Sequence, residues 1–233
     1  MMIRPIALGI GLVLSVILWF SARELNRRAR MMIIAMLLLG NLIAVVPWEA
    51  WVYFKSGQVI LLSTNGVKSV RDGLTFAVES KGYRQTNEAP AGVLEVMRDI
   101  QVREGEVATF SDLAGVISQE MRSHPIGMTE LLLFKLARSW YGTDSGRMEL
   151  PTVLIQIVYL VFVGWGVRKG WQRGGIQRDF VIGALLIVFY FWGMSFLALS
   201  ILRYMVPAIG VLIILIAGGL PSKSRTELRP QSL

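Results

Sequence analysis

The chain has 233 residues, and 54% of them are hydrophobic. A soluble domain is usually about 45–50% apolar, so the excess indicates membrane-spanning segments. There is no cysteine and one histidine, His124, which excludes disulfides, zinc–thiolate sites and cysteine nucleophiles, and we expect no metal site. The formal net charge of +8 does not indicate nucleic-acid binding, because the basic excess lies in three short patches beside apolar segments.

Two apolar segments open the chain, residues 5–22 and 31–47. The first is about 27 Å long as a helix, close to the ~30 Å of a hydrocarbon core, so both are predicted to span the membrane. A cleaved signal peptide is the alternative for the first segment. However, a basic cluster follows that segment, and we read it as a cytoplasmic turn. Its members are Arg23, Arg27, Arg28 and Arg30.

Residues 47–66, PWEAWVYFKSGQVILLSTNG, are predicted to carry the chain out of the membrane. Pro47 disfavours continued helix, so it is predicted to end or kink the span there. The aromatic side chains at 48, 51, 53 and 54 are typical of the headgroup layer. An extracytoplasmic insert, residues 55–149, follows. It is nearly neutral, with eleven Lys and Arg against twelve Asp and Glu. We assign residues 1–54 to two transmembrane helices joined by the basic turn.

The insert is predicted to be mixed but mainly helical. Asn65-Gly66 between β-prone runs predicts a hairpin, and Arg71-Asp72-Gly73 the next turn. Two amphipathic helices follow, with apolar faces that include Val93, Leu94, Met97 and Ile100 in the first and Leu113, Val116, Ile117 and Met121 in the second. Residues 129–140 are more apolar and predict a helix lying at the membrane interface, with a core helix of the insert as the alternative.

Three further spans are predicted in residues 150–220, followed by a cytoplasmic tail, residues 221–233. Residues 150–167 form one span, and residues 180–220 are long enough for a helical hairpin that turns near residues 200–203. The fold class is therefore an α-helical polytopic membrane protein with about five transmembrane helices. With the N-terminus outside and the C-terminus in the cytoplasm of a cell (inner) membrane, all three basic patches lie in the cytoplasm.

Arg203 is the most informative single residue, because it is the one charge in the apolar segment 180–220. An arginine at the tip of a hairpin can snorkel to the interface, or it can bind a phosphate at headgroup depth. Tyr204 follows it directly. Arg71 and Asp72 read either as a solvated surface pair or as part of a site, and Arg138 lies on the predicted helix 129–140. No carboxylate pair has the pattern of an acid–base dyad, so no catalytic residue is predicted.

Three stretches together resemble a known family. PWEAWVYFKSGQVILLSTNG resembles the Pro-Trp…Gly…Ser-Thr-Asn-Gly signature of bacterial GT-C glycosyltransferases, the dolichyl-phosphate-mannose-protein mannosyltransferase-like enzymes of glycosyltransferase family 39. RYMVPAIGVLIILIAGGL resembles their last span, and KLARSWYGTDSG resembles a stretch before a late span. The similarity covers about the last two-thirds of the chain. Where family members carry Arg-Asn after Pro-Trp, this chain has Trp51-Val52 nearby.

The resemblance implies transfer of a sugar from a polyprenyl-phosphate donor outside the membrane. Arg203 then matches the arginine near the donor phosphate, while Arg71, Asp72 and residues 63–66 help to close the outer face. The family's catalytic carboxylate lies in an N-terminal region, so we expect the C-terminal part of such an enzyme. The implied partners are membrane lipid, the polyprenyl-phosphate carrier and a catalytic N-terminal partner chain, without a further cofactor.

Two alternatives remain at the level of the sequence. A non-catalytic membrane subunit would use the insert to dock a partner or to bind lipid. A transporter is disfavoured, because no acidic or broken-helix site is visible within the predicted spans.

Overall fold

A computed structural model describes residues 9–57, 66–79, 90–143 and 148–219. Within these ranges the chain is helical and contains no strand. The elements are α1 (Ile10–Ser21), α2 (Arg27–Ser56), α3 (Gly66–Glu79), α4 (Ala91–Val102), η3 (Glu104–Glu106), α5 (Phe110–Ser123), α6 (Pro125–Arg138), α7 (Glu149–Arg173), α8 (Gly175–Leu197), η4 (Leu202–Tyr204) and α9 (Val206–Gly219).

Three of these helices, α2, α7 and α8, are long and apolar enough to cross a membrane. At 1.5 Å per residue the 25 residues of α7 extend over about 37 Å, which exceeds a hydrocarbon core of ~30 Å. Helices α1 and α9 are apolar but shorter in the described part of the chain. The predicted α-helical character is confirmed, and the predicted number of five spans stays a prediction.

Helix α2 does not end at Pro47, so of the two predicted effects of this proline, an end or a kink of the span, the end is wrong. The proline lies inside a continuous helix of 30 residues, and Gly57 ends it with a left-handed φ of 68°. A proline removes one backbone hydrogen bond, and a long helix tolerates this loss where its neighbouring turns are sound. At the other end, the Asn26 side chain caps the helix by accepting a hydrogen bond from the Ala29 N–H at 2.7 Å.

The predicted hairpin at Asn65-Gly66 is also wrong where it can be assessed. Residues 58–65 lie outside the described part, but Gly66 begins α3, so no second strand follows. Arg71, Asp72 and Gly73 lie in this helix rather than in a turn. Helix α3 carries apolar residues at helical spacing, which gives it one apolar face. Leu74 on this face lies in a core shared with α4, α5 and α6.

Helices α3 to α6 enclose a core of their own. The predicted apolar face of α4 is confirmed, since Val93, Met97 and Ile100 are all at most 2% exposed. In α5, Leu113 and Val116 are buried as predicted, whereas Met121 is exposed and Glu120 takes a buried position. Helix α6 brings Met128 and Leu131 into the same core, which favours the alternative interpretation of that segment as a core helix of the insert.

The apolar helices form the second core, in which α9 packs between α7 and α8. Close approach of α7 to α9 depends on Gly166, because a Cβ at this position would lie 2.6 Å from the Leu215 carbonyl oxygen. The Tyr159 hydroxyl on α7 donates to the Ile209 carbonyl oxygen at 2.7 Å. Helices α7 and α8 are joined through Gly174 and Gly175, both at positive φ. Most of residues 168–179, which lie between the predicted spans, therefore extend these two helices instead of forming a longer turn.

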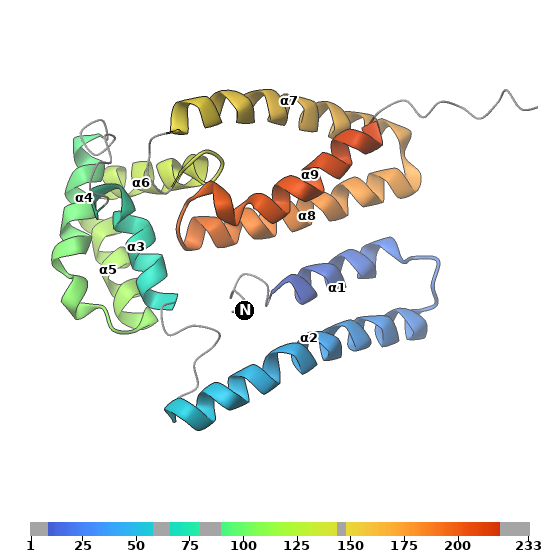
Figure 1. Cartoon of the computed structure of the whole chain (residues 1–233), viewed down its shortest axis with the longest axis horizontal. Coiled ribbons are helices and arrows are strands. Elements are labelled where there is room, and N and C mark those ends of the chain that lie inside the picture. The colour runs from blue at the N-terminus through green and yellow to red at the C-terminus, as the bar shows by residue number, and fades with distance from the viewer. Residues whose placement is uncertain (1–8, 58–65, 80–89, 144–147, 220–233) are drawn as a thin grey trace, which may run out of the picture.

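Figure 1 shows α3 to α6 gathered at one end of the apolar helices α1, α2, α7, α8 and α9. The start of α2 and the connection from α7 to α8 lie at the opposite end. These two places carry the first and second basic patches, at Arg27–Arg30 and Arg168–Arg178 by sequence. The third basic patch, at residues 223–229, lies outside the described residues.

Candidate functional site

The connection between α8 and α9, residues 198–205, carries Arg203, and we call it the Arg203 turn. Two elements of the insert hold it through backbone contacts. The Leu202 N–H donates to the Gly142 carbonyl oxygen at 2.8 Å, just after α6. A Cβ built at Gly73 would overlap the Ala198 carbonyl oxygen, so α3 meets the turn backbone to backbone. The insert therefore fixes the position of this turn.

Lys135 on α6 is a third contact to the turn. Its side chain is buried, with 4% of the residue exposed, and its ammonium donates to the Ala198 carbonyl oxygen at 3.1 Å. Burial, followed by the nearby positive charge of Arg138, lowers the pKa of Lys135 to about 7. The lysine thus caps the C-terminal end of α8 from the insert, where a donor satisfies an otherwise unpaired carbonyl.

Arg203 itself is exposed on η4, and its guanidinium lies 5.3 Å from the centroid of the Tyr204 ring. When a guanidinium lies over an aromatic face, its N–H donors remain available in the guanidinium plane. These donors suit bidentate contact with a phosphate. Ile201 and Met205, on either side of η4, are almost completely buried and hold the turn in place.

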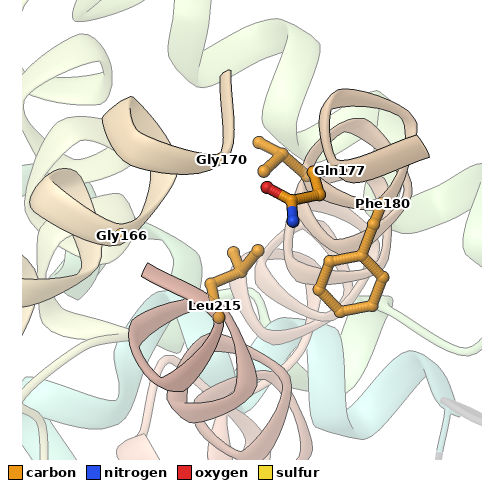
Figure 2. A pocket seen from close by; sticks show the side chains of 7 residues that line it. Gly166, Gly170, Gln177, Phe180 and Leu215 are labelled. Carbon is orange, nitrogen blue, oxygen red and sulfur yellow. The ribbon is translucent and has the colours of Figure 1, made fainter. Parts of the chain in front are cut away.

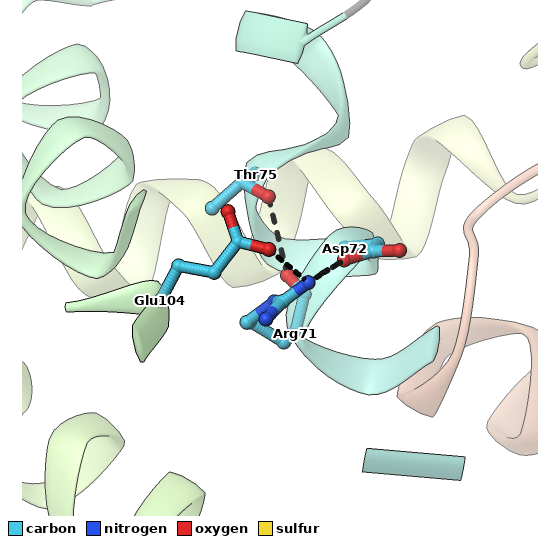
Figure 3. A network of polar contacts seen from close by, with 4 residues as sticks. All are labelled: Arg71, Asp72, Thr75 and Glu104. Atoms are coloured by element: carbon cyan, nitrogen blue, oxygen red, sulfur yellow. Dashed lines mark hydrogen bonds and ion pairs between the residues drawn. The ribbon is translucent and has the colours of Figure 1, made fainter. Parts of the chain in front are cut away.

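Arg71 and Asp72 belong to an ion network on the insert (Figure 3). The Arg71 guanidinium lies 2.8 Å from an Asp72 oxygen and 2.6 Å from a Glu104 oxygen. Arg71 is 8% exposed, so its charge is largely neutralised inside the insert. The ion pair between Arg71 and Glu104 connects α3 to η3, so these side chains stabilise the insert.

Arg138 forms a buried ion pair with Glu149, the first residue of α7. The two side chains lie 2.9 Å apart, and each residue is 3% exposed. The Glu149 carboxylate also accepts from the Thr143 N–H at 3.1 Å. Burial, followed by the Glu149 charge, raises the pKa of neighbouring Tyr141. This pair joins the end of α6 to the start of α7. Breaking it would leave an uncompensated buried charge.

We call the contact between the insert and the Arg203 turn, together with the start of α7, the junction. The space inside it is too small for a substrate. A cavity of about 10 Å³ lies between the insert and the turn, next to Gly73, Lys135 and Ser200. A cavity needs roughly 10–15 Å³ to hold even one water molecule, so no phosphate fits there. Any lipid phosphate would have to bind on the exposed side of the turn, where Arg203 lies.

Larger cavities lie among the apolar helices, away from the turn. One of about 450 Å³ is lined by residues of α1, α8 and α9. Another, of about 90 Å³, lies between α7, α8 and α9 (Figure 2). Gln177 of α8 and Leu215 of α9 line the second cavity, and on α7 the wall is formed by Gly166 and Gly170. Their walls are mostly apolar and offer lipid contact rather than acid–base chemistry.

The predicted site residues thus divide into two groups around one junction. Arg203 and Tyr204 lie on its exposed side, while Arg71, Asp72 and Arg138 are used within the insert and at its contact with α7. The sequence did not indicate Lys135 or Glu149 as partners of this junction. A charged residue within an apolar helical face is the available signal for Lys135, since such a residue must find a buried partner.

No protein-family model, curated protein or solved structure matches this chain.

Proposed function

We propose that this chain is the C-terminal part of a membrane glycosyltransferase of the GT-C type, which binds a polyprenyl-phosphate-linked sugar and supports transfer of that sugar outside the membrane. In this proposal five helices, α1, α2, α7, α8 and α9, span a cell (inner) membrane. The N-terminus lies outside and the C-terminus in the cytoplasm, and the insert stands on the outer face.

The observation that carries the proposal is the placement of Arg203. It is exposed at a turn between two apolar helices, on the same end of those helices as the insert. In a spanning chain, that end lies at headgroup depth, where the phosphate of a polyprenyl carrier also lies. A guanidinium binds phosphate in a bidentate manner, and Tyr204 beside it restricts its orientation.

The basic ends of the helices support the orientation. Arg27 at the start of α2 and Arg173 at the end of α7 both lie at the end of the helices away from the insert. Short basic segments are retained in the cytoplasm, so the insert is expected outside.

We assign substrate binding to this chain, and not the catalytic base. The carboxylates described at the junction pair with arginines: Asp72 and Glu104 with Arg71, and Glu149 with Arg138. These carboxylates are therefore engaged in ion pairs that hold the helices together. The resemblance places the catalytic carboxylate in an N-terminal region, which we expect a partner chain to contribute.

Binding of undecaprenyl phosphate to the purified chain in lipid nanodiscs tests the role of Arg203. We expect Arg203→Ala to weaken binding by about tenfold, or ~1.4 kcal/mol, and Arg203→Lys to restore part of the loss. Arg178→Ala is the matched control, because Arg178 is also exposed and lies over an aromatic ring, Trp171, at 4.4 Å. Equal binding by the native chain and Arg203→Ala, or an equal loss in Arg178→Ala, would contradict the proposal.

A non-catalytic membrane subunit is the second candidate. The pairing of the junction carboxylates with arginines favours it, since it leaves those groups to structural work. Both candidates predict that the chain co-purifies with a catalytic membrane protein, but this one predicts that binding of undecaprenyl phosphate does not depend on Arg203. Binding of undecaprenyl phosphate that is lost in Arg203→Ala and kept in Arg178→Ala would exclude it.

A further inference from the structure

Three side chains that can bind a metal ion meet in the insert, two of them one helical turn apart and the third on another helix. Asp99 lies on α4, Glu120 on α5, and His124 at the corner between α5 and α6. One ligand atom from each lies within 4.8 Å of the others. We expected no metal site from the sequence, because the chain has no cysteine and one histidine and Asp99 stands well before Glu120 and His124.

Glu120 provides an independent reason to expect a cation there. It is 1% exposed, and its Oε2 atom is buried without a hydrogen-bond partner among the described residues. The Arg103 guanidinium lies 3.6 Å from the other carboxylate oxygen, too far for a hydrogen bond. A buried carboxylate that is only partly compensated costs free energy, and a bound cation would offset this cost.

The two sides of the His124 ring also match a metal site. Nε2 lies 3.7 Å from the Asp99 Oδ2 atom, and Nδ1 lies 3.8 Å from the Glu95 Oε2 atom. With metal–ligand bonds of about 2.0–2.1 Å, two ligand atoms of a tetrahedral zinc ion lie roughly 3.3 Å apart, so Nε2 and Oδ2 need to move only a little. A carboxylate facing the other ring nitrogen is the usual outer partner of a metal-bound histidine.

We propose that Asp99, Glu120 and His124 bind a divalent transition-metal ion of the zinc class, with Glu95 orienting the imidazole. The ion joins α4 to the corner between α5 and α6. It stabilises the insert and takes no part in sugar transfer, so this site is independent of the function proposed above. One nitrogen and two oxygen ligands suit zinc better than calcium or magnesium, which prefer oxygen alone.

The test is a Zn²⁺ titration of the full chain in detergent, in competition with a chromogenic chelator. The chain has no cysteine and no other histidine, so an affinity tag without histidine leaves few competing strong ligands. We expect one equivalent of Zn²⁺ to bind and to raise the melting temperature. Glu95→Gln should weaken binding by about tenfold, as expected for an outer partner.

Three variants decide between the site and a general attraction to acidic side chains. His124→Ala should abolish binding, as should Asp99→Asn, whose side chain is 42% exposed and whose removal leaves the core intact. Glu130→Gln, at an exposed position of α6, should bind Zn²⁺ like the native chain. Absence of stoichiometric binding to the native chain, or unchanged binding by His124→Ala, would overturn the proposal.

Discussion

Arg71, Arg138 and Arg203 have the same side chain in different surroundings. The first two are buried against carboxylates, at 2.6 Å from Glu104 and 2.9 Å from Glu149. Arg203 is exposed and lies over an aromatic ring. A guanidinium inside protein must be neutralised where it stands, whereas one at a surface can bind a ligand from outside. Burial therefore separates structural arginines from the candidate phosphate ligand.

Lys135 makes the contact between insert and Arg203 turn sensitive to pH. Its folded-state pKa is lowered to about 7, while an unfolded lysine titrates near 10.4. Between these values the unfolded chain binds more protons, so stability rises with pH in this window. The gain is limited to about 1.4 kcal/mol per pH unit for one proton, and below pH 7 the burial penalty is present in full.

We therefore expect the free energy of unfolding of the native chain, relative to Lys135→Met, to increase from pH 7 to pH 10. Unfolding in mixed micelles at several pH values measures this difference. Lys68→Met removes an exposed lysine of α3 and should show no such trend. A difference between native chain and Lys135→Met that stays constant over this range would contradict a buried lysine at the junction.

At the scale of elements, the hydrophobic pattern of the sequence predicted those features that depend on neighbouring residues along the chain. The apolar face of α4 and the turn between α8 and α9 were both predicted from the sequence. The end of α2 and the start of α3 were not, because Pro47 and Asn65-Gly66 carry strong local signals for breaks and turns. A continuous long helix and a shared core with α4 to α6 outweigh those signals.

The residues of the candidate site were also predicted only in part. Arg203 could be found because a single charge in an apolar segment is conspicuous. The contacts of Lys135 with Ala198, of Arg138 with Glu149, and of Asp99 with Glu120 and His124 could not be predicted, since each joins segments that meet only after the helices have packed. Spacing along one chain does not show contacts between separate helices.

Gly73 tests the contact between α3 and the Arg203 turn. A side chain there would overlap the Ala198 carbonyl oxygen, so Gly73→Ala must displace α3 or the turn. We expect a loss of about 1–3 kcal/mol, which exceeds the helix-propensity gain of ~1 kcal/mol. Thermal unfolding followed by tryptophan fluorescence measures it.

Gly115 on α5 provides the matched control. A Cβ at this position meets no atom within 4 Å, so Gly115→Ala should stabilise the chain by up to about 1 kcal/mol. Equal effects of the two substitutions would contradict the close approach of α3 to the turn.

At the scale of the whole molecule, the insert at one end and the basic residues at the other predict how the chain lies in the membrane. The native chain has no cysteine, so single cysteines can be labelled without background. Glu130→Cys, on the exposed side of α6, should react with a membrane-impermeant maleimide in intact cells. Gln172→Cys, near the end of α7, should react only after permeabilisation. The opposite labelling would reverse the proposed orientation.

The most direct test of the central claim is to locate the bound lipid phosphate itself. An undecaprenyl phosphate analogue with a photoreactive group next to the phosphate would be cross-linked to the full chain in nanodiscs, and the labelled peptides identified by mass spectrometry. We predict that label concentrates on residues 198–205 and decreases when unlabelled undecaprenyl phosphate is added in excess. Label on residues 168–178, at the opposite end of the helices, or label that excess lipid does not displace, would contradict a phosphate site at Arg203.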